Sequence, residues 1–472
     1  MTATAPLPVA QDDLVVSDVG ASRYPPLSLC LGFGVGTAGV SIVLNTIAVY
    51  FPTLMSTVLG MSPALAGTLV MVSKIYDAFA DIGIGALSDR TETRWGRRRP
   101  YLLFGALVSF ASLMMIFVVP VPTGTMGIVL YMGVALVIYS TVYSMFNVPY
   151  LAMPAEMTSG NAQRLRLISY RTACLGLGQL VALALSAWLI KIGGGGVGGY
   201  RLMGVAMATL ALVTMLASFF GTARARFDTR RTDAPHRLTR ADLASLAGNR
   251  PLMMLLGAKL AQYVSFGILQ PANLLFLLNV LKVGYTGMIH LAVVQNLAVF
   301  VSMPAWSRIA RRIGKRNAYL LAQAIMIPAT LSWWWTDASI TLPAIWWRAA
   351  LFGFASGGAL LMSTSMLPDT MEYDYLRTGK RREGVFASLY SVNEKLGFAI
   401  GAAVVGYGLA LGGYVATTGG RIIQQAPDAI AALYLIKTAL PALLLAGGAI
   451  LVWLYRLDDD HLQALRAGKP RT

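Results

Sequence analysis

The sequence predicts an all-α membrane protein that crosses the bilayer many times. Of its 472 residues, 56% are hydrophobic and only 12% are charged, whereas soluble domains carry about 25% charged residues. The mean hydropathy is +0.62. Apolar runs of about 20 residues, which is long enough to cross a bilayer as a helix, recur along the whole chain.

Each apolar run is interpreted as one transmembrane helix, and the runs form two groups of six. The first group is expected at about 28–50, 64–88, 100–120, 125–150, 167–193 and 202–221. The second is expected at about 251–280, 285–307, 317–335, 341–366, 385–414 and 429–456. The domain organisation follows as a tail at 1–24, an N-terminal half at 25–221, a polar linker at 222–250, a C-terminal half at 251–456 and a tail at 457–472.

The basic residues predict the orientation in the membrane. Clusters of arginine and lysine follow the second, fourth, sixth, eighth and tenth spans. The opposite loops hold only a few basic residues, namely Lys191, Arg201, Lys282, Arg421 and Arg348 at the edge of a span. By the positive-inside rule, the even-numbered loops and both termini are cytoplasmic, and the chain is expected in the inner or plasma membrane.

The net charge of +17 has the same explanation. In a soluble protein it would suggest nucleic acid as a partner. Here the arginines lie between apolar spans, so topology and contact with anionic lipid headgroups account for them, and no nucleic-acid role is expected. The first 24 residues lack a basic segment followed by an apolar core, so no cleavable signal peptide is expected there.

A weak internal repeat links the two halves. Residues 96–103, with the sequence Gly-Arg-Arg-Arg-Pro-Tyr-Leu-Leu, are echoed by residues 314–321, Gly-Lys-Arg-Asn-Ala-Tyr-Leu-Leu. Each segment follows a span that ends in serine. Transporters built from such repeats bind substrate near the middle of the bilayer, between the halves.

Two carboxylates in the second span are the strongest functional signal. Asp77 and Asp81 are four residues apart and so share one face of a helix. An ionised carboxylate facing lipid is costly, so both are expected to point into the protein or a wet cavity. Carboxylate oxygens suit Na⁺ or a proton. The structural alternative is an ion pair with Lys74 or another buried base.

Lys395 in the eleventh span has two interpretations. It can extend to the membrane interface, or it can face the second-span acids and tune their charge. The neighbouring Glu394 is expected to point elsewhere, towards the cytoplasmic surface.

Polar and aromatic residues in other spans are candidates for a substrate pocket. An arginine suits sugar hydroxyls or a carboxylate, and an amide both donates and accepts hydrogen bonds. The structural alternatives are a loop position at the cytoplasmic end for Arg171, an interhelical hydrogen bond for Asn147 and interfacial belts for most aromatic residues. The substrate candidates are Asn147, Arg171, Tyr143, Gln262, Asn273 and Trp347, and a cytoplasmic gate is predicted at Asp89, Arg90, Gly96, Arg97 and Arg98.

Other chemistry is not expected. Cys30 and Cys174 both lie in apolar runs and are interpreted as small buried side chains. The three histidines are too scattered for a metal site. The chain has neither a phosphate-binding glycine-rich loop nor a nucleophile with its base, so direct ATP coupling, an enzyme activity and a cofactor other than the coupling ion are not predicted.

These motifs together resemble the glycoside–pentoside–hexuronide:cation symporters, the relatives of melibiose permease in the major facilitator superfamily. The resemblance rests on residues 74–100, 146–150 with Glu156, 164–171, 372–381 and 383–397. The Gly-Arg-Arg-Arg-Pro ending of the first segment is also similar to plant-type sucrose:proton symporters. The fold implied is the major facilitator fold, with twelve helices in two six-helix halves.

The resemblance implies roles for individual residues. Asp77 and Asp81 match the cation site, and Lys395 matches the lysine near it. Arg171 matches an arginine at the sugar pocket, and Asn147 matches a position that is aspartate in melibiose permease. The sugar-binding aspartate of the first helix is replaced by a position such as Gly39 or Ser41, which argues against melibiose and other α-galactosides.

The leading hypothesis is therefore secondary active transport by alternating access. A sugar, glycoside or hexuronide would enter with a cation, either Na⁺ or H⁺, and a monomer is expected by analogy with this architecture. The alternatives are a proton-driven exporter of drugs or metabolites and a carrier of lysolipids on the same fold. The sequence does not identify the substrate.

Overall fold

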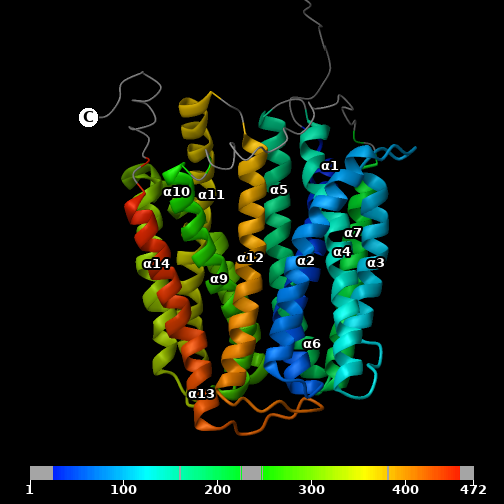
Figure 1. Ribbon diagram of the computed structural model, residues 1–472, viewed down its shortest axis with the longest axis vertical. Helices are drawn as coiled ribbons and strands as arrows, with labels where there is room; N and C mark the ends of the chain where they lie inside the picture. The colour runs from blue at the N-terminus through cyan, green and yellow to red at the C-terminus, as the bar shows by residue number, and fades with distance from the viewer. Residues whose placement is uncertain are drawn as a thin grey trace, which may run out of the picture.

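The computed structural model describes residues 25–158, 161–223, 225, 246, 248–379, 382–455 and 457, and its regular elements are helices (Figure 1). The tails predicted at 1–24 and beyond 457, and most of the linker predicted at 222–250, lie outside the described residues. The N-terminal elements are α1 (Leu27–Thr53), η1 (Leu54–Val58), α2 (Pro63–Arg90), α3 (Arg99–Phe117), α4 (Thr125–Met157), α5 (Asn161–Leu180), η2 (Val181–Leu185), α6 (Ser186–Ile192) and α7 (Val197–Gly221). The C-terminal elements are α9 (Arg250–Asn279), α10 (Gly284–Leu331), η3 (Ser332–Trp335), α11 (Leu342–Thr378), α12 (Glu383–Leu411), α13 (Pro427–Tyr434), η4 (Leu435–Ala439) and α14 (Leu440–Leu454).

The prediction of an all-helical, multi-pass membrane protein is confirmed. Within the described residues, 10 helices are long and apolar enough to cross a membrane. Two features reconcile this number with the twelve predicted spans. The helix α2 has 28 residues but carries five charged side chains and is not among the ten. The helix α10 is counted once, although it consists of two helices that meet at Gly314, where φ is 81°.

Local sequence signals explain where several helices begin and end. The Ser62 hydroxyl accepts a hydrogen bond from the Leu65 amide at 3.3 Å, and Pro63 follows as the first residue of α2. The Asn249 side chain caps α9 in the same way. The helix α11 ends at Gly379, which adopts the left-handed conformation with φ 67°. The fourth helix is longer than the span predicted at 125–150, because α4 continues through Pro149 and Pro154 to Met157.

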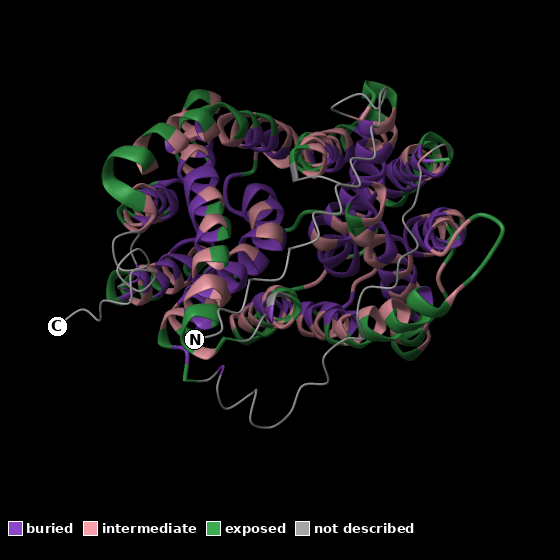
Figure 2. Cartoon of the chain, turned by 90° about the horizontal axis from the view of Figure 1, so that it is seen from above, coloured by how far each residue is buried: buried purple, intermediate pink, exposed green. Residues whose placement is uncertain are grey.

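The helices form two groups, and the interface between the groups passes between α2 and α12. In the N-terminal group α1 packs on α5 and α7, and in the C-terminal group α9 packs on α12 and α14. Buried residues face inwards in each group (Figure 2). Between the groups, α2 and α12 approach closely because both present glycine: a Cβ on Gly67 would lie 2.9 Å from the Gly406 Cα.

The internal repeat is visible in the backbone. Gly96 and Gly314 both have positive φ, 90° and 81°. Each lies in the turn between two helical segments and directly precedes basic residues. The next residues form equivalent ion pairs: Arg97 with Glu156 at 3.0 Å, and Lys315 with Asp369 at 2.7 Å. Each pair connects this turn to the last part of the following long helix, α4 or α11. The two halves therefore share a structural device and not only a sequence motif.

Candidate functional site

The two acids of α2 face α12 and are bridged by one lysine. The Lys395 Nζ lies 3.0 Å from Asp77 Oδ2 and 2.5 Å from Asp81 Oδ2. It also donates a hydrogen bond to the Asp77 backbone oxygen at 2.9 Å. All three ammonium protons therefore have an acceptor. Of the two interpretations of Lys395, the structure agrees with the one in which it faces the acids.

The carboxylates differ in their surroundings. The Asp77 side chain is 2% exposed, and its Oδ1 accepts a hydrogen bond from the Ser144 hydroxyl of α4 at 2.8 Å. The Asp81 side chain is 23% exposed, and its buried Oδ1 has no hydrogen-bond partner. This orphaned oxygen and the oxygens now bound by Lys395 are hard ligands of the kind that Na⁺ or a proton uses. Among the described residues no group of three or more His, Cys, Asp or Glu side chains could hold a metal ion.

Two hydrogen bonds between side chains connect α2 to α4 beside the acids. The hydroxyls of Ser73 and Ser140 lie 2.7 Å apart, one turn from the Asp77–Ser144 contact. The sequence analysis missed Ser144. The signal was present, since Ser73 and Asp77 on α2 and Ser140 and Ser144 on α4 have the same four-residue spacing.

Three further charges surround the bridge. Lys74 is buried, with its Nζ 5.5 Å from the Tyr139 ring centre and 5.7 Å from the Tyr143 ring centre. The expectation that Glu394 points to the cytoplasmic surface was wrong: its carboxyl lies among the charges of Lys259, Lys74 and Lys395. With Asp77, Asp81 and Glu394 against the three lysines, the cluster is formally neutral.

Lys259 is a second residue that the sequence analysis missed. It is 1% exposed and donates hydrogen bonds to Gln262 Oε1 at 3.0 Å and to Ser363 Oγ at 3.1 Å. The Gln262 Nε2 atom is buried and unpaired. The only available signal was a lysine inside an apolar run, which does not indicate what the side chain faces.

Two other predicted substrate residues, Asn147 and Arg171, lie on α4 and α5. Asn147 follows Ser144 by one turn on α4 and is half-buried. The Arg171 side chain on α5 interacts electrostatically with Tyr150, also of α4, and its buried Nε atom has no hydrogen-bond partner. Asn147 therefore lies close to Tyr143 and Ser144 along α4, whereas Arg171 belongs to α5, which contacts α4.

Asn273 and Trp347 belong to a different region. Asn273 accepts a hydrogen bond from Lys437 at 2.5 Å and lines a small cavity within the C-terminal half, which Arg348 also lines. The Trp347 side chain is 46% exposed and stacks on the Arg348 guanidinium at 4.3 Å. The structure does not bring these two residues to the acids of α2.

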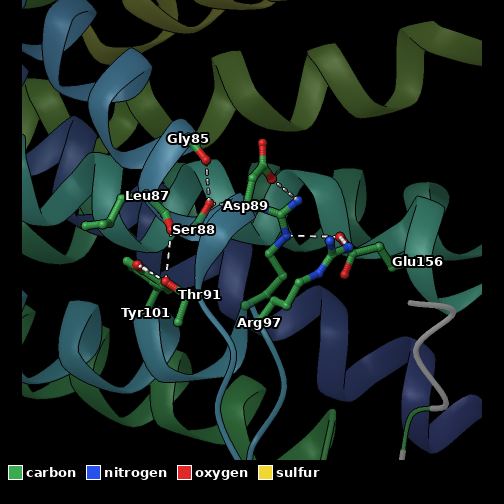
Figure 3. A network of polar contacts seen from close by, with 9 residues as sticks. Gly85, Leu87, Ser88, Asp89, Thr91, Arg97, Tyr101 and Glu156 are labelled. Atoms are coloured by element: carbon green, nitrogen blue, oxygen red, sulfur yellow. Dashed lines mark hydrogen bonds and ion pairs between the residues drawn. The ribbon is translucent and has the colours of Figure 1, made fainter. Parts of the chain in front are cut away.

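Of the predicted gate residues, Asp89, Arg97 and Arg98 form a network at the end of α2 (Figure 3). The Arg98 guanidinium lies 2.6 Å from Asp89 Oδ1 and 3.0 Å from Glu156 Oε1, and donates to the Ser88 hydroxyl at 2.7 Å. Arg97 binds the same Glu156 oxygen at 3.0 Å. The turn that positions both arginines contains Gly96, whereas Arg90, the last residue of α2, is exposed. The network connects α2, α3 and α4 within one half.

The fold and the charged interface define the class of protein, a polytopic helical membrane carrier. A model of the family described as MFS/sugar transport protein matches residues 32–459, and the chain belongs to this family. Its members are transporters and not enzymes, as the sequence analysis predicted.

Relatives cover nearly the whole chain. A glucuronide carrier protein homolog of Escherichia coli (strain K12) is 28% identical, over 92% of this chain and 93% of its own. A putative glycoside/cation symporter of the same organism has the same identity and coverage. An isoprimeverose transporter of Lactiplantibacillus pentosus is 26% identical, over 92% of this chain and 89% of its own.

Solved structures support the fold alone. A bacterial homolog of the human lysosomal transporter Spinster, inward-facing and unoccupied, superposes with a TM-score of 0.62 at 16% identity, covering 94% of this chain and 98% of its own. A structure from a study of proton-dependent oligopeptide transporters gives 0.63 at 11% identity, covering 93% and 99%.

Proposed function

We propose that the protein is a cation-coupled symporter of a sugar or glycoside. The observation that carries this proposal is the Lys395 bridge, because it links a pair of acids on α2 to a helix of the other half. A cation that binds Asp77 and Asp81 competes with the lysine for the same oxygens. Its arrival therefore changes the contact between the halves, which is what coupling to alternating access requires.

The coupling ion is Na⁺ or H⁺. Both neutralise carboxylate oxygens, and both would release Lys395 from Asp81. Substrate would bind between the halves, beside the α4 face with Tyr143 and Asn147, with Arg171 and Gln262 as further candidates. By linkage, cation and substrate raise each other's affinity by the same factor.

The relatives support a carbohydrate substrate, since their names specify a glucuronide, a glycoside and isoprimeverose. Hydroxyl-rich substrates suit the polar and charged character of this interface. The same character disfavours a lysolipid carrier, for which an apolar cleft is needed. We place the protein in the inner or plasma membrane as a monomer, with both termini and the Arg97–Arg98 network on the cytoplasmic side.

A second candidate is an exporter of a small polar anion. A putative 2,3-dihydroxypropane-1-sulfonate exporter of Escherichia coli (strain K12) is 24% identical over 85% of this chain. Three lysines at the interface are compatible with such a substrate.

The test is uptake into proteoliposomes with an imposed Na⁺ or proton gradient. The substrate panel contains isoprimeverose, a phenyl glucuronide and D-glucuronate, with mannitol as a control. Accumulation that follows one gradient and collapses with an ionophore is the expected result. Accumulation that is independent of both gradients would contradict coupling, and efflux driven by a gradient would favour the exporter.

A further inference from the structure

A cavity of about 350 Å³ lies at the end of the bundle opposite the Arg97–Arg98 network. Residues of both halves line it, including Thr57 and Lys191 from the first half and Asn279 and Arg421 from the second. The loop between α12 and α13 forms one wall and runs across the bottom of Figure 1, beneath both groups of helices. By the proposed topology this end is the external face.

The wall of the cavity is a strap, residues 414–425, that pairs with the other half through its backbone. The Thr417 amide donates to the Ser56 carbonyl at 2.8 Å, the Gly419 amide to Val58 at 2.9 Å and the Gly420 amide to Thr57 at 2.9 Å. These bonds join the C-terminal half to η1 at the end of the first span. The cavity is therefore complete only while the two halves are closed at this end.

Glycines permit this contact. A Cβ on Gly196 would lie 2.5 Å from the Gly419 oxygen, and a Cβ on Gly420 would lie 2.6 Å from the Gly195 oxygen. Gly420 also has a φ of 80°, which L residues rarely adopt. The glycines of these two loops therefore allow the backbone of one half to approach the backbone of the other closely.

The lining of the cavity has the chemistry of a site for an acidic sugar. Lys191 and Arg421 contribute positive charge. Neither takes part in the ion pairs found among the described residues. None of the described residues that line the cavity is Asp or Glu. Tyr285, Tyr414 and Asn279 supply hydroxyl and amide groups. A volume of this size accommodates one sugar ring.

We propose that this cavity is a second binding site, distinct from the interface of α2 and α12, that holds the carboxylate and hydroxyls of an anionic sugar only while the strap is closed. A ligand with affinity for one state alone shifts the population towards that state. Such a ligand at high external concentration would therefore delay reopening of this face. The inference goes beyond the proposed function and depends on it only for the direction in which the face opens.

The test uses cysteine protection with D-glucuronate as the probe. Ile422→Cys places a thiol on the cavity wall, and its reaction with a maleimide is followed in the full-length protein in nanodiscs. D-Glucuronate is expected to slow the reaction, and D-glucose is expected to do so much less. Adding Lys191→Gln and Arg421→Gln is expected to weaken protection by about tenfold or more, since each removes a charge-assisted hydrogen bond. The control variant is Arg201→Gln, an exposed residue on the same side that does not line the cavity.

Equal protection by glucose, or protection that persists in the double variant, would overturn the proposal. An Asp77→Asn background separates the two sites, because the fold and the protection at residue 422 are expected to survive there while coupled uptake is lost. Loss of uptake together with intact protection supports both inferences. Loss of protection in that background assigns the effect to the α2–α12 interface and overturns the second site. The Ser56–Thr417 pair provides an independent readout: D-glucuronate should speed disulfide formation between cysteines at these positions.

Discussion

Lys395 of α12 binds Asp77 and Asp81 of α2 at 3.0 and 2.5 Å, and so a single side chain pairs with two carboxylates across the interface between the halves. In a low-dielectric interior, neither acid can stay ionised at low cost without it. The ion pairs that compensate the negative charge of α2 are therefore also a contact between the two halves.

Removal of the lysine alone should destabilise the protein. Lys395→Met leaves the buried Asp77 and the half-buried Asp81 without their direct partner, for which a cost of up to about 3–5 kcal/mol is expected. The double variant with Asp81→Asn should recover part of that loss, because it removes one of the stranded charges. Thermal unfolding in detergent, with and without the second substitution, measures both effects. No recovery in the double variant would contradict the bridge.

Asp77→Asn should abolish accumulation against a gradient. The amide oxygen can still accept the Ser144 hydrogen bond, so the fold is expected to persist, but the negative charge that attracts the cation is lost. Counterflow and gradient-driven uptake in proteoliposomes distinguish binding from coupling. Asp337→Asn, an exposed loop residue whose carboxylate accepts hydrogen bonds from Ser339, is the matched control. Full accumulation by the Asp77 variant would exclude this residue from coupling.

Ser144→Ala should raise the apparent cation affinity by about tenfold or more, since a hydrogen bond to a charged group contributes about 1.5–3 kcal/mol. The donor stabilises the cation-free carboxylate, and its loss favours the cation-bound form. The measurement is the Na⁺ or proton concentration at half-maximal uptake. Ser140→Ala, which breaks the neighbouring contact to Ser73, should change this value much less. Identical shifts in the two variants would show that packing, and not the hydrogen bond to Asp77, is responsible.

Cross-linking the strap should arrest transport. The Thr417 amide and the Ser56 carbonyl lie 2.8 Å apart, so cysteines at these positions are close enough for a disulfide. Oxidation of Ser56→Cys/Thr417→Cys is expected to stop uptake, and a reductant is expected to restore it. Each single variant serves as a control. Undiminished uptake by the fully cross-linked protein would mean that this end need not open.

The helices and the acid pair could be predicted from the sequence because their signals are local. A run of apolar residues is sufficient to predict a span, and a four-residue spacing places Asp77 and Asp81 on one face. What such signals cannot specify is which helix that face meets. Lys395 therefore had two interpretations, and Glu394 was assigned to the wrong environment, since its neighbours Lys74 and Lys259 come from distant spans.

The strap is a second feature whose contacts the sequence could not specify. Its glycines are visible in the sequence, but a glycine-rich loop is compatible with many conformations. Only the positions of Gly195 and Gly420 in space reveal that the loops touch. The pairing of Arg97 with Glu156 and of Lys315 with Asp369 could be anticipated in part, because the repeated turn was recognisable while the acidic partners were not.

The close contact of Gly67 with Gly406 has a mechanical consequence. It lies on the same two helices as the Lys395 bridge, ten residues before Asp77, or about 15 Å along α2. If one half tilts so that the two glycines separate, we expect the tilt to turn about the Lys395 bridge. The ion pair would then be the pivot of this tilt, and a cation that weakens the ion pair would make it easier for the two halves to move.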